Sequence, residues 1–444
     1  VLAQKYEVVV TNPPYMGSSG MGAKLSAYVK QNYPDTKSDM STVMMEKTLA
    51  MCSENGFMAM INIPVWMFLS SYEKLRNNIL SQNSYVNMLH FGRGVFGSDF
   101  GTTSFVIGKK HVNNYLASYR RLFEKQGAVD SVNVKEQWFF EGKGKYVAKQ
   151  ENFAKIPGAP VAYWVSENVL KNFSITKLKT ILNPKQGTST GNDELFVRLW
   201  HEISNEKFSD KEISIESALS SEYKYFPLDK GGTFRRWYGN NEKVIAMDNE
   251  SYNLLLNMGN HLPSRELYFK EGITWSKITS SGASYRYDNK GFVFSSVGLK
   301  GFPSEIDKWY VLGLLNSVIT TYCLQIISPG LSTVSGDLEK IPCKFDEDNR
   351  KIINELVQKN ISLSKSDWDA FETSWDFTKH PLVVTSDQCI VNSESSANTQ
   401  LTTNHSSQAT SGQLLVNSDS SANTQLSTTH YPLTTIAQAY QRWE

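Results

Sequence analysis

A short β-branched run that stops at two consecutive prolines constrains this chain more than any other feature. Residues 8–11 read Val-Val-Val-Thr, which favours a strand, and Asn12, Pro13, Pro14 and Tyr15 follow it directly. Each proline fixes φ and lacks a backbone N–H, so the turn is stiff and cannot continue the strand. We expect a fully buried strand that presents an amide, proline carbonyls and a ring at its carboxyl end. Open α/β sheets bind ligands at that end of their strands.

Helix and strand patterns alternate over the next hundred residues. Asp39 stands where it can cap a helix whose apolar positions face inward. This order predicts an α/β fold, the second half of a doubly wound, Rossmann-like sheet that ends in a hairpin. The expected helices cover residues 23–32, 42–52 and 71–80, the last of them exposed, and the expected strands cover residues 57–63, 85–91 and 102–108.

The composition of the chain changes several times beyond this sheet. Residues 115–123 look helical, and the aromatic residues 136–140 look like a strand. An amphipathic helix is expected over residues 350–362, and a 25-residue polar repeat follows it. We therefore expect six parts: a sheet domain (1–125), a bridge (126–164), a mixed α+β domain (165–345), a helical packing segment (346–384), a Ser/Thr/Asn-rich linker (385–430) and the start of a helix (431–444).

Basic and aromatic residues alternate around glycines in the α+β domain. Glycine lets a backbone approach a phosphate closely, and arginine pairs with phosphates or reads guanine edges. A structural alternative is a knot of rings in the domain core, and we expect Trp237 to be buried. The candidate DNA-binding residues are Lys230, Arg235, Arg236, Tyr238 and Asn192.

Composition limits the classes of protein that fit. The 444 residues carry a net charge of +1, so any nucleic-acid contact must come from a local basic face. Four scattered cysteines indicate free thiols in a reducing compartment, the cytoplasm, and neither a disulfide framework nor a metal site. No apolar run reaches the ~18 residues that a membrane span needs.

The segment Asn-Pro-Pro-Tyr resembles the catalytic motif of amino-group DNA methyltransferases, specifically those that act on N6 of adenine. Similar motifs occur at residues 44–47, 54–57 and 94–96, and the basic domain resembles target-recognition domains. Over most of residues 1–380 the chain is similar to bifunctional restriction–modification enzymes and, above all, to the BREX phage-defence methyltransferases. The resemblance implies a class I methyltransferase fold and a site-specific adenine methyltransferase of a defence system. It also implies double-stranded DNA as partner and leaves other defence subunits as candidates.

The resemblance assigns roles to the motif residues. Asn12 and Pro13 would accept the two N–H groups of the adenine amine, with Pro14 stiffening the turn. Tyr15 and Phe96 would sandwich the flipped base. The structural alternative for Phe96 is a plug in a hairpin.

The cofactor implied is S-adenosyl-L-methionine, without a metal. Met44 would lie against its adenine ring and Asp39 would touch it, whereas the alternatives are a core methionine and a helix cap. The glycine-rich turn and acidic residue that hold this cofactor do not precede the motif. We therefore expect a fragment, trimmed at both ends and inactive alone. Two further readings stay open: a non-catalytic DNA specificity module, and methylation of cytosine N4, protein glutamine or RNA adenine.

Overall fold

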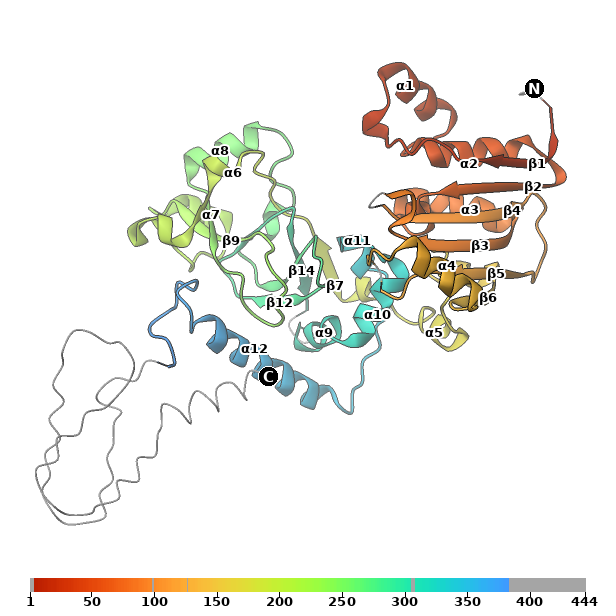
Figure 1. Cartoon of the computed structure of the whole chain (residues 1–444). Coiled ribbons are helices and arrows are strands. Elements are labelled where there is room, and N and C mark those ends of the chain that lie inside the picture. Colours follow the sequence, from red (N-terminus) through yellow and green to blue (C-terminus); the bar gives the residue numbers. More distant parts are fainter. Residues whose placement is uncertain (1–3, 98–99, 126, 305–307, 383–444) are drawn as a thin grey trace, which may run out of the picture. The chain divides into compact units, whose positions relative to one another are not determined.

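The computed structural model describes residues 4–97, 100–125, 127–304 and 308–382 (Figure 1). The chain divides into two compact units, Val1–Trp368 and Asp369–Glu444. The first unit holds three β-sheets. In the described part of the second unit, Ser374 Oγ donates a hydrogen bond to Asp369 at 2.8 Å.

A six-stranded sheet forms the amino-terminal part of the first unit (Figure 1). Its strands lie in the order β1-β2-β4-β3-β5-β6. β1 is parallel to β2 and β3 is parallel to β5, whereas β4 runs antiparallel between β2 and β3. The carboxyl ends of β1, β2, β3 and β5 therefore meet at one edge, which we call the carboxyl edge. The strands are β1 (Tyr6–Thr11), β2 (Cys52–Asn62), β3 (Ser84–Gly92), β4 (Thr102–Gly108), β5 (Leu116–Arg121) and β6 (Lys145–Lys149).

One face of this sheet is closed by a hydrophobic core. Met58, Phe105 and Tyr85 point into it, and Trp66 and Tyr119 complete a cluster of fully buried side chains. Burying each such side chain stabilises the fold by about 1.5–3 kcal/mol. The predicted helices and the alternation of strand types are confirmed here. The helices of this part are α1 (Ala23–Asn32), α2 (Met40–Met51), α3 (Glu73–Gln82) and α4 (Val132–Phe140).

The expectation that the first strand is fully buried is wrong. Val8 is 60% exposed and Val10 is 71% exposed. In the parallel register Val8 lies beside Phe57, which is itself 45% exposed, so the three side chains share one open face. β1 is the edge strand of the described sheet, so a β-branched run here does not require burial on both sides.

Two element types were predicted wrongly next to this strand order. Residues 115–123 form the strand β5, because its backbone pairs with both β3 and β6. Residues 136–140 belong to the helix α4, which starts where the Ser131 side chain accepts a hydrogen bond from Val134 N. Local composition lost to tertiary pairing in the first case and to a helix cap in the second.

The helix α3 is also less exposed than expected. Arg76 is 1% exposed and donates hydrogen bonds to four backbone carbonyls, including those of Trp66 and Gly158. Desolvation lowers the pKa of Arg76 to about 10. This arginine joins α3 to the segment that follows β6.

Two four-stranded sheets and several helices form the rest of the first unit. One sheet has the order β13-β9-β10-β8 and the other β12-β11-β14-β7. The strands are β7 (Leu182–Lys185), β8 (Val197–Leu199), β9 (Tyr225–Asp229), β10 (Lys243–Ala246), β11 (Gly272–Ser276), β12 (Tyr285–Asp288), β13 (Val293–Phe294) and β14 (Gly298–Pro303). The helices are α5 (Glu167–Asn172), α6 (Asp193–Phe196), α7 (Ile215–Ser220), α8 (Asn249–Asn257), α9 (Lys308–Leu315), α10 (Val318–Ile327), α11 (Ser335–Leu338) and α12 (Arg350–Trp368).

The helix expected over residues 350–362 is present and continues to Trp368 as α12. The linker at 385–430 and the helix start at 431–444 lie outside the described residues. Within the described residues, no single helix is long and apolar enough to cross a membrane. α9 and α10, which are bent by 64° at their junction, meet that criterion only as a pair. The described residues also contain no cluster of three metal-ligating side chains.

Candidate active site

The motif segment, defined as residues 12–15, follows β1 at the carboxyl edge of the six-stranded sheet. Pro13 is buried, Asn12 and Pro14 are exposed, and Tyr15 is partly buried. The Tyr15 hydroxyl lies 2.8 Å from Asn12 Oδ1, to which it donates a hydrogen bond, and 3.3 Å from the carbonyl of Ile61. Ile61 belongs to β2, so Tyr15 ties the segment to the neighbouring strand and orients the Asn12 amide.

Burial raises the pKa of the Tyr15 phenol. The hydroxyl therefore stays protonated at neutral pH and keeps donating to Asn12. An amide oxygen has two lone pairs, so Asn12 Oδ1 can accept a second hydrogen bond while it holds this one.

The segment between β3 and β4 brings two phenylalanines to the same edge. Phe100 meets Tyr15 edge to face, with ring centroids 5.5 Å apart and planes at 80°. Phe96 is 58% exposed and has a left-handed backbone, with φ at 61°. Sequence reasoning missed Phe100, although its place just before Gly101 and the strand β4 was a usable signal. Stacking of a base on Phe96 stays a prediction.

The residues predicted for the cofactor have structural partners. Asp39 is 7% exposed and caps α2, because its Oδ1 accepts hydrogen bonds from Ser41 N at 2.8 Å and from Ser41 Oγ at 2.7 Å. Met40 N also donates to Met16 O at 2.8 Å, so the loop after the motif segment is tied to this helix start. Met44 is partly buried and packs against the core. A cofactor role for Asp39 and Met44 stays a prediction.

The basic segment, defined as residues 230–240, is held by ion pairs and rings of its own unit. Lys230 pairs with Asp193. The Arg235 guanidinium lies 2.8 Å from Asp367 on α12 and 5.0 Å from the centroid of the Trp368 ring. These contacts fix two of the predicted DNA-binding side chains within the protein.

The remaining candidates divide between exposed and engaged side chains. Arg236 is exposed and lies 5.4 Å from the centroid of the Phe234 ring. Tyr238 is 7% exposed, with the Lys365 ammonium 5.0 Å from its ring centroid. Asn192 caps α6 by accepting a hydrogen bond from Leu195 N at 3.2 Å. Their contacts with DNA stay predictions.

A buried charge cluster that the sequence did not reveal adjoins the basic segment. Lys300 is fully buried, with its Nζ 3.1 Å from Asp288 and 3.4 Å from Asp229. Arg286 is 1% exposed and adds a second positive charge. Burial, followed by the nearby Asp288 carboxylate, raises the pKa of Asp229 well above its usual value. Asp229 immediately precedes Lys230, so this cluster anchors the start of the basic segment.

Sequence comparison relates the chain to known methyltransferases. Residues 1–96 match the family model of the Eco57I restriction-modification methylase. The chain is 34% identical over 396 residues to the adenine-specific methyltransferase BrxX of Escherichia coli O9:H4 (strain HS), a match covering 86% of this chain and 31% of that protein. It is 36% identical over 402 residues to the adenine-specific methyltransferase PglX of Lacticaseibacillus casei (strain Zhang), covering 86% of this chain and 33% of that protein. The chain thus spans about a third of the length of these relatives.

Structural comparison gives the same fold in a solved protein. The type IIL restriction-modification enzyme MmeI, solved in complex with DNA, superposes with a TM-score of 0.53. The match covers 83% of this chain and 50% of that one, at 12% sequence identity, so it shows the fold alone. The resemblance expected from the motif segment is confirmed: this chain is related in sequence, over most of its length, to adenine-specific methyltransferases.

Proposed function

We propose that this chain carries the base-binding part of a site-specific DNA methyltransferase that acts on N6 of adenine in a phage-defence or restriction–modification system. The observation that carries the proposal is the state of the motif segment. Asn12 is exposed at the carboxyl edge, with its amide oriented by the Tyr15 hydroxyl 2.8 Å away. The relatives' names, which specify adenine, support the choice of base.

The chain's own residues would position the amine for direct transfer. Asn12 Oδ1 and the Pro13 carbonyl each accept one N–H of the adenine amine, which turns the nitrogen lone pair towards the incoming methyl group. The Tyr15 ring provides a face for the unstacked base. No covalent enzyme intermediate is needed, and orientation carries more of the rate than a general base does.

S-adenosyl-L-methionine would supply the methyl group when bound. Met44 and the Asp39 carboxylate are the residues of this chain proposed to contact it, although Asp39 Oδ1 already accepts two hydrogen bonds at the start of α2. The fit is therefore partial, and we derive no step from this contact. DNA would be bound by exposed basic residues of the α+β domain, Arg236 foremost.

The decisive experiment separates chemistry from binding at Asn12. Asn12→Ala removes the acceptor and is expected to lower the rate of methyl transfer by at least ~100-fold, the cost of losing one aligned transition-state hydrogen bond. DNA affinity is expected to stay within about twofold, because Asn12 contacts no phosphate in this scheme. Methyl transfer from labelled cofactor to DNA gives the rate, and fluorescence anisotropy gives the affinity.

Asn32→Ala is the matched control, because Asn32 is an exposed asparagine at the end of α1. It should leave both quantities unchanged. Methyl transfer that survives Asn12→Ala at the wild-type rate would refute the proposal.

A second candidate function is a specificity module that binds DNA without catalysis. It is favoured by the capping role of Asp39, which leaves this carboxylate engaged within the protein. Calorimetry with S-adenosyl-L-methionine distinguishes the two. Micromolar binding by this chain supports the enzyme, and binding of DNA without binding of cofactor supports the module.

A further inference from the structure

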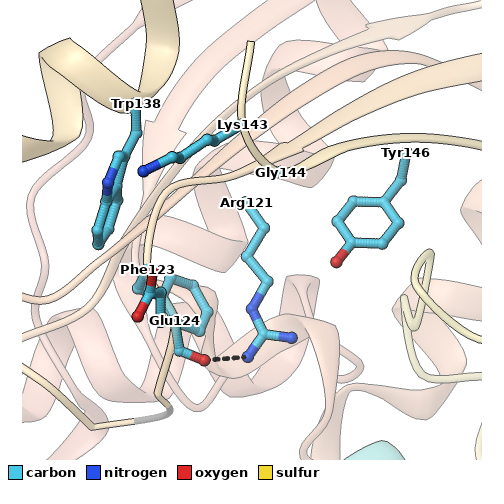
Figure 2. Close-up of a pocket in the computed structure, with 7 residues that line it drawn as sticks. All are labelled: Arg121, Phe123, Glu124, Trp138, Lys143, Gly144 and Tyr146. Atoms are coloured by element: carbon cyan, nitrogen blue, oxygen red, sulfur yellow. Dashed lines mark hydrogen bonds between the residues drawn. The ribbon is translucent and has the colours of Figure 1, made fainter. Parts of the chain in front are cut away.

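A cavity of about 380 Å³ lies beside the end of β5, outside the motif segment (Figure 2). Its volume lies within the range of small-molecule sites, which is about 300–1,000 Å³. Arg121 enters it from the end of β5, Tyr146 from β6, and Trp138 from α4. Phe123 and Lys143 come from the connecting segments and complete the basic and aromatic wall.

Aromatic rings hold the Arg121 guanidinium in place. Its central carbon lies 4.5 Å from the centroid of the Phe123 ring and 5.6 Å from that of Trp164. One terminal nitrogen lies 3.5 Å from the carbonyl of Glu124, the contact dashed in Figure 2. Nε of Arg121 is buried and has no hydrogen-bond partner among the residues that the structure describes. A pinned guanidinium with an unused donor is preorganised for a bidentate anion such as phosphate.

A second cation faces the same cavity. Lys143 points towards Trp138 in Figure 2, with its ammonium 5.5 Å from the ring centroid. Lys143 also lies 3.4 Å from Glu141, but the two side chains are 55% and 41% exposed. An ion pair this exposed is worth little, so an incoming phosphate can replace it. The exposed Glu124 is the one carboxylate among the lining residues, which leaves a net positive charge there.

The cavity shares an edge with the motif segment. β1, β2, β3 and β5 run in the same direction, so Arg121 at the end of β5 and Asn12 after β1 both lie at the carboxyl edge. In the order β1-β2-β4-β3-β5 the two strands are four spacings apart. At about 4.8 Å per spacing this is ~19 Å, the rise of roughly six nucleotides of a duplex strand at 3.4 Å each.

We propose that this cavity binds one nucleotide unit, with its phosphate on Arg121 and Lys143 and its sugar and base against Trp138 and Tyr146. The nucleotide can come from the bound DNA strand or from free nucleotide, because both present the same phosphate and ring. The DNA source rests on the proposed function; nucleotide binding itself does not.

The test uses the whole chain and thymidine 5′-monophosphate, which has no exocyclic amine for Asn12 to hold. Calorimetry should show binding at least tenfold tighter than that of thymidine, because the phosphate supplies the charge-assisted contacts. Arg121→Gln and Lys143→Glu should each weaken it at least fivefold. Lys149→Glu is the matched control on β6, where the lysine contacts only the Asn114 side chain at 3.2 Å, and it should change binding less than twofold.

A second arm identifies the source of the nucleotide. If Lys143→Glu also weakens duplex binding threefold or more, and one neutral methylphosphonate about six nucleotides from the methylated adenine removes that difference, the nucleotide belongs to DNA. If only thymidine 5′-monophosphate is affected, the pocket takes free nucleotide. Unchanged binding of both ligands by folded Arg121→Gln and Lys143→Glu proteins overturns the inference. A normal methylation rate alongside that result leaves the proposed function standing.

Discussion

The motif segment and the basic segment carry similar sequence signals but use their side chains differently. In the motif segment, Asn12 is exposed and has its amide set by one hydroxyl. In the basic segment, Lys230 and Arg235 are bound to acidic residues of the protein itself. The difference teaches that an amide beside rigid prolines has few structural uses, whereas an arginine among aromatic rings serves packing as readily as nucleic-acid binding. Substitutions should therefore change chemistry in the first segment and stability in the second.

The largest effect is expected at Tyr15. Tyr15→Ala removes both the base-stacking face and the hydroxyl that orients Asn12, so methyl transfer should fall by about 100-fold. Tyr15→Phe keeps the face and should lose only about tenfold. The free energy of unfolding should change by less than ~0.5 kcal/mol in Tyr15→Phe. Single-turnover methylation and urea denaturation measure the two quantities, and equal rates for both variants would remove the proposed role of the ring.

The second effect is expected at Arg235 and concerns stability. Arg235→Ala removes the contact with Asp367 at 2.8 Å and the stacking on Trp368, and should lower the free energy of unfolding by about 2 kcal/mol. Chemical denaturation of Arg235→Ala, Asp367→Ala and the double variant gives the coupling between the two side chains. Additive effects, with DNA affinity falling tenfold in Arg235→Ala, would show that this arginine serves DNA and would break the comparison.

The third effect depends on pH and tests the anchor of the basic segment. The raised pKa of Asp229 means that the folded state keeps a proton that the unfolded chain releases near pH 4. Its stabilising contribution is full below that pH and is lost as the pH rises through the folded-state pKa. Asp229→Asn should therefore flatten the loss of stability with rising pH by about 1 kcal/mol or more. Urea midpoints across the pH range measure this, and the exposed Asp210→Asn should leave the wild-type slope intact.

The smallest effect is expected at Arg236. Arg236→Ala should leave the free energy of unfolding within ~0.5 kcal/mol, because the side chain is exposed. It should weaken DNA binding by about fivefold and reduce the salt dependence by about one phosphate contact. Anisotropy titrations at several salt concentrations measure both. Binding and salt slope that equal those of the wild type would remove the basic segment from the DNA interface.

Much of the sheet was predictable because its elements are locally consistent. α1 and β4 were predicted with the bounds they have, and Asp39 caps α2 as its capping alternative implied. The strand β5 was not predictable from residues 115–123 alone, because its partners β3 and β6 are distant in sequence. The exposure of β1 depends on its position at the edge of the described sheet, which composition does not encode.

The candidate site was predictable only where chemistry constrains residue type. Asn12 to Tyr15 lie at the carboxyl edge of the sheet, where the strand–proline pattern put them. Phe100, which meets the Tyr15 ring, was missed because aromatic residues near a hairpin have many packing roles. The charge cluster around Lys300 was missed because its members come from three strands and share no sequence pattern.

The most direct measurement is the identity of the methylated product. DNA incubated with the protein and isotopically labelled S-adenosyl-L-methionine is hydrolysed to nucleosides and analysed by mass spectrometry. The account predicts label in N6-methyldeoxyadenosine, and none above background with Asn12→Ala. Label in N4-methyldeoxycytidine or in protein, or label in adenine that persists with Asn12→Ala, would contradict it.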